Sequence, residues 1–171
     1  MLSKSTIVLC DTCVILEAFR VGAWTALISK FNILVSETIV AETLWYTDSR
    51  GVKKPIDLAH YIKNKQIQSF DISMKDLKHF VGKYDPAYQD RLDLGELSLL
   101  CYLFQQDGSN MLICSGDAIV FKILGKARKS AQGVSLEELL SSIGHAKPVS
   151  HQFRKKFKER HGQSGFSDSF S

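Results

Sequence analysis

Short apolar runs alternate along the chain with longer segments whose apolar residues recur at helical spacing. Five of these runs are predicted as strands, at 6–10, 32–35, 67–72, 111–114 and 133–134. Parallel strands need crossover connections such as helices, so the alternation predicts an α/β fold. We expect three α/β/α layers around a central parallel sheet of about five strands. The segment 67–72 alternates apolar and polar residues, which indicates an edge strand.

Capping residues mark where several helices between these strands begin. Ser36 is expected to cap a helix that runs to about residue 46, and Pro55 to open one that runs to about residue 65. Ser73 begins a helix that ends near residue 82. Other helices are predicted at 14–19, 97–106, 118–124 and from 135 onwards, where 135–138 has the capping-box pattern. Polar stretches around 85–86 and at 107–108 predict a loop and a turn.

The apolar pattern extends to about residue 147, and the chain of 171 residues fits one domain. Residues 148–171 are expected to form a basic, partly disordered tail, since Gly and Ser dominate from 162 onwards. The chain carries a net charge of +4, most of it in this tail. A basic tail can contact a polyanion such as nucleic acid, and a solvated terminal helix is the simpler alternative. Phe166 and Phe170 are candidates for anchoring to a partner.

The sequence favours neither a membrane-spanning protein nor a redox protein. No apolar run approaches the roughly 18–20 residues of a membrane span, and we see no signal peptide, so a cytoplasmic protein is expected. Cys10 and Cys13 form a C-x-x-C, the motif of thioredoxin-like redox proteins. Such proteins also need a cis-proline that follows an apolar strand, and none of the three prolines of this chain follows one. The four cysteines lack the spacing of a zinc site and are expected to be buried free thiols.

Four acidic residues stand in apolar surroundings. Asp11 and Asp117 each come directly after a predicted strand, and ligands bind at the carboxyl ends of parallel strands. Glu42 lies among apolar positions of a predicted helix, and Glu96 follows a glycine at the start of a long apolar helix. Acids are rarely buried unless they are paired or bind a metal, so each of these positions needs an explanation.

Each acid also has a simpler explanation when it is taken alone. Asp11 and Asp117 can cap the helices that follow them, Asp93 and Glu96 have capping-box spacing, and Glu42 can pair with a surface lysine. Together in one cleft, the carboxylates would repel one another unless a cation lay between them. Oxygen ligands favour Mg²⁺ or Mn²⁺, which can generate hydroxide and support phosphodiester cleavage.

The order of these motifs resembles the PIN domain family over about residues 5–145. The motifs are Asp11-Thr12 after a strand, Glu42 in the second helix, Gly95-Glu96 before an apolar helix, Ser115-Gly116-Asp117 after a strand, and the helix start at 135–140. The resemblance implies strand order 3-2-1-4-5 and a Mg²⁺- or Mn²⁺-dependent nuclease domain in residues 1–147, usually acting on RNA. The implied metal-binding and catalytic acids are Asp11, Glu42, Glu96 and Asp117, supported by Thr12 and Ser115, with Asp93 as a further candidate.

Two residues depart from the family pattern without removing an acid. Cys13 stands where members often have Asn or Ser, and Gly116 replaces a commoner polar residue. Many bacterial members are toxins of toxin–antitoxin pairs. The resemblance therefore implies, as candidate partners, RNA, a small inhibitory antitoxin-like protein and a second copy in a homodimer. This chain is longer than a typical toxin of that kind, mainly at 47–92 and in the tail.

A metal-dependent ribonuclease is the main hypothesis, and two alternatives remain open. Phosphates would be guided by the tail or by basic residues nearby in sequence, namely Arg50, Lys53, Lys54, Lys63 and Lys65. The first alternative is a non-catalytic PIN-like module that binds RNA or protein, which would bind no Mn²⁺. The second is an aspartyl-phosphate hydrolase, which fits less well because Cys13 stands where that class places its second Asp.

Overall fold

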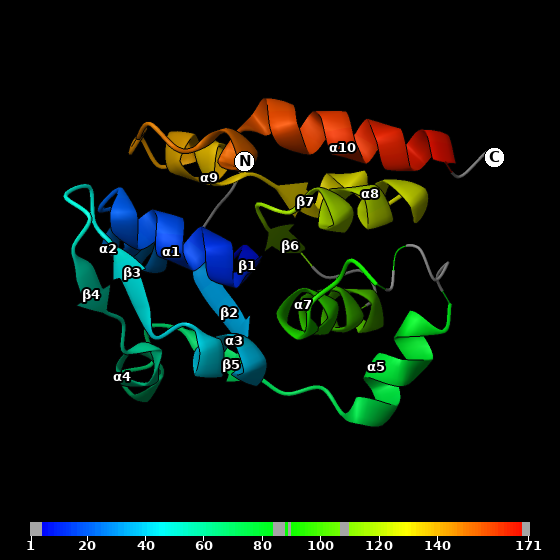
Figure 1. Cartoon of the computed structure of the whole chain (residues 1–171), viewed down its shortest axis with the longest axis horizontal. Helices are drawn as coiled ribbons and strands as arrows, with labels where there is room; N and C mark the ends of the chain where they lie inside the picture. Colours follow the sequence, from blue (N-terminus) through cyan, green and yellow to red (C-terminus); the bar gives the residue numbers. More distant parts are fainter. Residues whose placement is uncertain (1–4, 84–87, 89, 107–109, 169–171) are drawn as a thin grey trace.

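Five parallel strands form the central sheet of the computed structural model, which describes residues 5–83, 88, 90–106 and 110–168 (Figure 1). The strands are β1 (Ile7–Cys10), β2 (Asn32–Ser36), β5 (Gln68–Phe70), β6 (Met111–Cys114) and β7 (Gly133–Val134). They stand in the order β5-β2-β1-β6-β7, and numbered within this sheet alone the order is 3-2-1-4-5. Helices lie on both sides of the sheet, which confirms the three-layer α/β/α prediction (Figure 1).

The centre of the sheet is apolar on both faces, as expected for parallel strands covered by helices. Val8, Leu9 and Cys10 of β1 are fully buried, and β1 pairs with β6 in the register Leu9↔Ile113. The short strand β5 forms one edge of the sheet, in agreement with the prediction for 67–72. This arrangement brings the carboxyl ends of β1 and β6 side by side.

Most helices begin at the capping residues that were predicted from the sequence. They are α1 (Thr12–Arg20), α2 (Trp24–Lys30), α3 (Glu37–Glu42), α4 (Leu58–Lys63), α5 (Met74–Val81), α7 (Leu94–Gln105), α8 (Ala118–Lys126), α9 (Leu136–Ser142) and α10 (Lys155–Asp168), with 3₁₀ turns η1 (Ser130–Gln132) and η2 (His151–Phe153). Ser36 and Ser73 cap α3 and α5, and the capping box before α9 is present. The long apolar helix α7 begins three residues earlier than predicted, at its own capping box.

The helix predictions were wrong at 43–46 and at 55–57, where the structure has the two strands of a hairpin and the segment that leads into α4. α3 ends at Glu42, and β3 (Trp45–Thr47) pairs antiparallel with β4 (Lys53–Pro55) as a separate two-stranded sheet. The turn is closed by Asp48, whose side chain accepts hydrogen bonds from two backbone amides, and by Gly51 at φ +78°. Pro55 therefore lies in an edge strand, and Asp57 caps α4 instead.

The disorder expected from residue 162 onwards is also corrected, as far as Asp168, because this part of the expected tail is helical. Residues 155–168 form α10, which packs along α8. A Cβ on Gly125 would overlap the backbone of Gly162, and one on Gly165 would overlap the backbone of Lys122. Gly165 of α10 and Gly125 of α8 are thus the small residues that let the two helix backbones approach closely. Figure 1 shows α10 lying alongside α8.

Several predictions fall on residues that the structure does not describe. These are the polar stretch at 85–86, the turn at 107–108 and the candidate anchor Phe170. In the described part of the chain, no single helix is long and apolar enough to cross a membrane. Only α1 and α2 taken together, with a bend of 118° between them, meet that length and composition.

Candidate carboxylate site

The adjacent ends of β1 and β6 bring Asp11 and Asp117 together. Cys10 and Cys114 are register partners, and the Asp11 amide donates to the carbonyl of Cys114 at 3.2 Å. Ser115 lies buried between the two acids. Its hydroxyl donates to Asp11 Oδ2 at 2.9 Å and accepts from the Asp117 amide at 2.9 Å. One serine therefore sets the relative position of both carboxylates.

Glu42 and Glu96 reach the same place from two other helices. Glu42 is the last residue of α3, and Thr12 Oγ1 donates to its Oε1 at 2.5 Å. Glu96 lies in the first turn of α7. The residue before it, Gly95, would place a Cβ only 2.9 Å from Glu42 Oε1. Glycine at this position thus lets the start of α7 approach the end of α3.

These side chains line one cavity of about 380 Å³, which we call the carboxylate cavity. It is lined by Asp11, Thr12, Cys13, Leu16, Glu42, Asp93, Glu96, Gly116, Asp117 and Gln152. All four predicted acids, together with Thr12 and Asp93, are among its lining residues. Asp11 and Glu96 are only 3% and 5% exposed, whereas Glu42 lies at the exposed side of the cavity.

The carboxylates of this cavity are close enough to affect one another. Burial raises the pKa of Asp11 to about 6, against the opposing effect of hydrogen bonds from Cys13 and Ser115. Burial also raises the pKa of Glu96 to about 8, and the charges of Asp11, Asp93 and Asp117 add to that rise. No described lysine or arginine lines the cavity or forms an ion pair with these acids. The negative charge is therefore without a protein counter-ion in the described chain.

The simpler explanations for single acids are partly correct as well. Asp11 accepts from the Thr12 amide at 2.7 Å, Asp117 accepts from the Ile119 amide at 2.8 Å, and Asp93 and Glu96 form a complete capping box. Glu42, by contrast, pairs with no described lysine. Each capping bond uses one carboxylate oxygen, so capping and ligand binding are compatible at the same residue.

The donor set of the cavity suits a hard divalent cation. Carboxylate and hydroxyl oxygens are the ligands preferred by Mg²⁺ and Mn²⁺. Among the described residues, Oε1 of Glu96 and Oδ2 of Asp117 accept no hydrogen bond and remain available. No group of three or more His, Cys, Asp or Glu side chains within the described ranges has the geometry of a metal site already formed. The residues fit such a cation by the type of their donor atoms alone.

Sequence reasoning missed the contribution of the segment that follows α9. Gln152 of η2 lines the carboxylate cavity, and the next residue, Phe153, packs on Gly116 so closely that a Cβ there would overlap its ring. The absence of a side chain at Gly116 thus makes room for Phe153. The unusual glycine was the one available signal, but nothing local indicated which residue it would meet.

Polar contacts attach the same segment to α1. The Ser150 amide donates to Glu17 Oε1 at 2.7 Å, and Arg20 donates to both oxygens of Glu17. Although burial opposes it, hydrogen bonds from Arg20 and Ser150 hold the pKa of Glu17 below its usual value. Further along, Lys158 binds Glu138 at 2.8 Å. The start of the expected tail is therefore held against α1, and Gln152 forms part of the wall of the carboxylate cavity.

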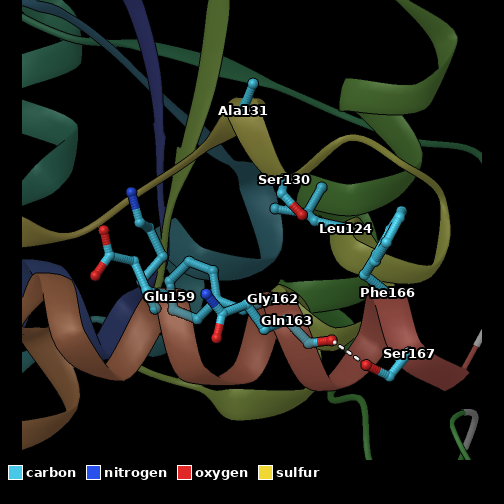
Figure 2. Close-up of a pocket in the computed structure, with 10 residues that line it drawn as sticks. Leu124, Ser130, Ala131, Glu159, Gly162, Gln163, Phe166 and Ser167 are labelled. Atoms are coloured by element: carbon cyan, nitrogen blue, oxygen red, sulfur yellow. Dashed lines mark hydrogen bonds between the residues drawn. The ribbon is translucent and has the colours of Figure 1, made fainter.

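A larger cavity of about 520 Å³ lies elsewhere, between α8, η1 and α10 (Figure 2). Figure 2 shows Leu124 and Phe166 bordering it from α8 and α10. Its polar lining includes groups already bonded within the protein, such as Ser167, whose hydroxyl donates to the carbonyl of Gln163 at 3.1 Å. It shares no lining residue with the carboxylate cavity. We therefore place the candidate chemistry in the smaller cavity.

The four cysteines are free thiols, as predicted. Cys10, Cys101 and Cys114 are buried, whereas Cys13 borders the carboxylate cavity, where its thiol donates to Asp11 Oδ2 at 3.0 Å. Comparisons of the chain with protein-family models, with curated proteins and with solved structures give no match in any of the three.

Proposed function

We propose that this chain is a Mg²⁺- or Mn²⁺-dependent nuclease that hydrolyses phosphodiester bonds of RNA. The observation that carries the proposal is the convergence of Asp11, Glu42, Glu96 and Asp117 from four separate elements on one cavity. Within the described chain, no cation of the protein compensates their charge. Buried carboxylates without a counter-ion are unfavourable, and a divalent cation removes that cost.

Each residue has a distinct part in this proposal. Asp11, Glu42, Glu96 and Asp117 would hold the cation, which when bound lowers the pKa of a water molecule and stabilises charge on the leaving oxygen. Ser115 holds Asp11 and Asp117 in position, and Thr12 holds Glu42. The resemblance to the PIN domain family, with the strand order it implies, supports RNA as the substrate. A toxin role, an antitoxin-like partner and a homodimer stay predictions of that resemblance.

A cleavage assay tests the proposal directly. Labelled RNA and single-stranded DNA are incubated with Mn²⁺, with Mg²⁺ or with EDTA, using the unaltered protein and Asp117→Asn. Asparagine caps a helix about as well as aspartate, so this variant keeps the start of α8 and loses only the charge. We expect metal-dependent cleavage that falls at least about 100-fold in the variant.

The matched control is Asp57→Asn. Asp57 also caps a helix, α4, but lies outside the carboxylate cavity. Its replacement should leave cleavage within about twofold of the unaltered protein. Equal activity of Asp117→Asn and Asp57→Asn would contradict the proposed site.

The second candidate is a module that binds RNA or protein without cutting it. One observation favours it: every acid of the cavity except Glu42 already has a structural role at a helix start. Titration calorimetry with Mn²⁺ separates the two functions. Binding that disappears in Asp117→Asn supports the nuclease, whereas no heat of binding at millimolar Mn²⁺ supports the module.

A further inference from the structure

A second cavity adjoins the carboxylate cavity on the side of the β3–β4 hairpin. This side cavity measures about 420 Å³ and shares Cys13, Leu16, Glu42 and Gln152 with the carboxylate cavity. Beyond these it is lined by Glu17, Arg20, Trp45, Tyr46, Thr47, Ser150 and Phe153. Its volume lies in the range of small-molecule and nucleotide sites. A ligand at the four acids that extends along the surface would therefore reach the hairpin.

Two aromatic residues of the hairpin, Trp45 and Tyr46, line this cavity, and Trp45 is the more exposed of them. Trp45 is 48% exposed, a large fraction for tryptophan, which is mostly buried in folded proteins. Its neighbour Tyr46 packs against Phe19 of α1, with the ring centroids 5.4 Å apart and the ring planes tilted by 32°. Two-stranded hairpins are marginally stable alone, so this contact holds the hairpin against α1. Trp45 is thus a fixed and accessible aromatic surface.

The surroundings of Trp45 are basic. Lys53 Nζ lies 3.9 Å from the Trp45 ring centroid and forms no ion pair with a described residue. Arg50 and Lys54 share one acid, Asp48, at 3.7 and 3.4 Å. The hairpin therefore keeps an excess of positive charge beside its exposed tryptophan. Aromatic rings with interleaved cations are the pattern by which proteins hold single-stranded nucleic acids.

We propose that the side cavity binds an unpaired base of a single-stranded polynucleotide, stacked on Trp45. The nucleotide next to it would place its phosphate at the carboxylate cavity, and Lys53 would meet the backbone on the hairpin side. The inference rests on the proposed function, because it names the form of substrate that the four acids receive. In a duplex both faces of a base are covered by neighbouring pairs, so stacking on Trp45 selects unpaired strands.

Tryptophan fluorescence gives a readout that does not depend on cleavage. Trp24 is 2% exposed and enclosed by Phe19 and Tyr61, so a change on ligand addition reports Trp45. The unaltered protein with millimolar Ca²⁺, which carboxylate oxygens also bind, is titrated with three probes of about eight nucleotides: single-stranded RNA, the same backbone without bases, and an RNA duplex. We expect saturable quenching by the first probe and little by the other two.

Substitutions at the hairpin then test the stacking contact. The Trp45 variants lack the fluorescent reporter, so their affinities are measured by the fluorescence anisotropy of end-labelled probes. Trp45→Ala should weaken binding of the base-containing strand about 10-fold or more while leaving the abasic strand unchanged, and Trp45→Phe should retain most of the affinity. Phe166→Ala is the matched control, because Phe166 is an aromatic of similar exposure, 44%, on the other cavity. It should leave affinity for all three probes unchanged.

The outcomes separate this inference from the proposed function. Base-dependent binding at Trp45 in a protein that never cleaves would support the inference and overturn the nuclease. Cleavage by the unaltered protein, with Trp45→Ala binding the base-containing strand as tightly as before, would overturn the inference alone. In that case the exposed Leu44, Trp45 and Val52 would form a protein contact instead.

Discussion

Asp11 and Asp117 each serve a helix start and the carboxylate cavity at once. One oxygen of each accepts a backbone amide of α1 or α8, and both side chains line the cavity. This double use explains how acids remain at the ends of buried strands without an ion pair. Asp→Asn and Asp→Ala at these positions therefore have different effects. Asparagine removes only the charge, whereas alanine removes both the charge and the helix cap.

Glu96→Gln should stabilise the protein in the absence of metal, and only at high pH. The pKa of Glu96 is raised to about 8, chiefly by burial, so the folded state retains a proton that the unfolded chain releases. The stability contributed by this proton is fully present below the unfolded pKa, near 4.5, and is lost as the pH rises through about 8. Glutamine cannot ionise. At about pH 8.5 the variant should therefore gain roughly 1–3 kcal/mol in the free energy of unfolding.

Denaturant titrations in EDTA at about pH 4 and about pH 8.5 measure this difference. Glu37→Gln is the control, because Glu37 is an exposed residue at the other end of the same helix as Glu42. It should change stability little at either pH. An equal gain for Glu96→Gln at both pH values would show that charge repulsion is not its cause.

Gly116→Ala should loosen the wall formed by the segment after α9. The added methyl group would overlap the ring of Phe153, so either the ring or the strand end has to move. We expect a loss of about 1–3 kcal/mol in stability. Gly82→Ala is the control, because its nearest new contact would be an ordinary 3.4 Å. Pairing Gly116→Ala with Phe153→Leu should recover part of the loss; no recovery would mean that the ring is not the obstacle.

At the scale of elements, the sheet could be predicted and two attached pieces could not. The five strands are short apolar runs with clear polar boundaries. Each helix cap is a single side chain that bonds a backbone amide a few residues away, so both features can be predicted from the local sequence. The four acids were recognisable because each interrupts a strong apolar pattern. The hairpin was missed because 39, 40 and 44 keep helical spacing, while the ladder between β3 and β4 is a contact between segments.

The same reasoning explains the error at α10. Gly162 and Gly165 both lower helix propensity, and the benefit of Gly165 appears only when α8 lies against it. Gln152 carries no recognisable motif, and its place in the cavity depends on how Phe153 meets Gly116. Residues brought to a site by packing between distant segments leave no periodic signal that sequence inspection can use.

Two glycines of α10 give a matched test of its packing. Gly165→Ala would overlap the backbone of Lys122 and should separate α10 from α8, at a cost of about 2 kcal/mol or more. Gly162→Ala would meet nothing closer than Ser130 Oγ at 3.6 Å, and alanine favours the helix by about 0.5–1 kcal/mol. Thermal melts and limited proteolysis within 148–168 measure both. Similar behaviour of the two variants would contradict the close crossing.

At the scale of the whole molecule, charge of opposite sign lies side by side. The carboxylate cavity is acidic, whereas the hairpin beside it is basic and the whole chain carries +4. Residues 154–160, which follow the cavity wall at Gln152, add five basic residues against one acid. A polyanion is attracted to the rim by such a field, while the cavity itself admits it only with a cation present.

Mn²⁺ should therefore stabilise the whole protein, and more strongly at about pH 8 than at about pH 5. With the pKa of Asp11 raised to about 6 and that of Glu96 to about 8, protons compete with the metal in acid. At a concentration about 100 times its dissociation constant, the ion should add about 2.7 kcal/mol to the free energy of unfolding. Melting curves with and without Mn²⁺ measure this. The gain should vanish in Asp117→Asn, and the same gain at both pH values would argue against carboxylate ligands.

The thiol of Cys13, which lines the carboxylate cavity, affects which metal ions could bind there. Cys13 donates to Asp11 at 3.0 Å, and burial beside that charge raises its pKa well above the ordinary value, so it remains protonated. Hard ions such as Mg²⁺ prefer oxygen ligands and do not bind a protonated thiol. A soft ion such as Cd²⁺ displaces the proton and gains a thiolate among the oxygens. If the cavity binds Mg²⁺ as proposed, the Cys13 sulfur would be the one atom of its described lining that favours a soft metal ion, and Cys13→Ser should remove that preference.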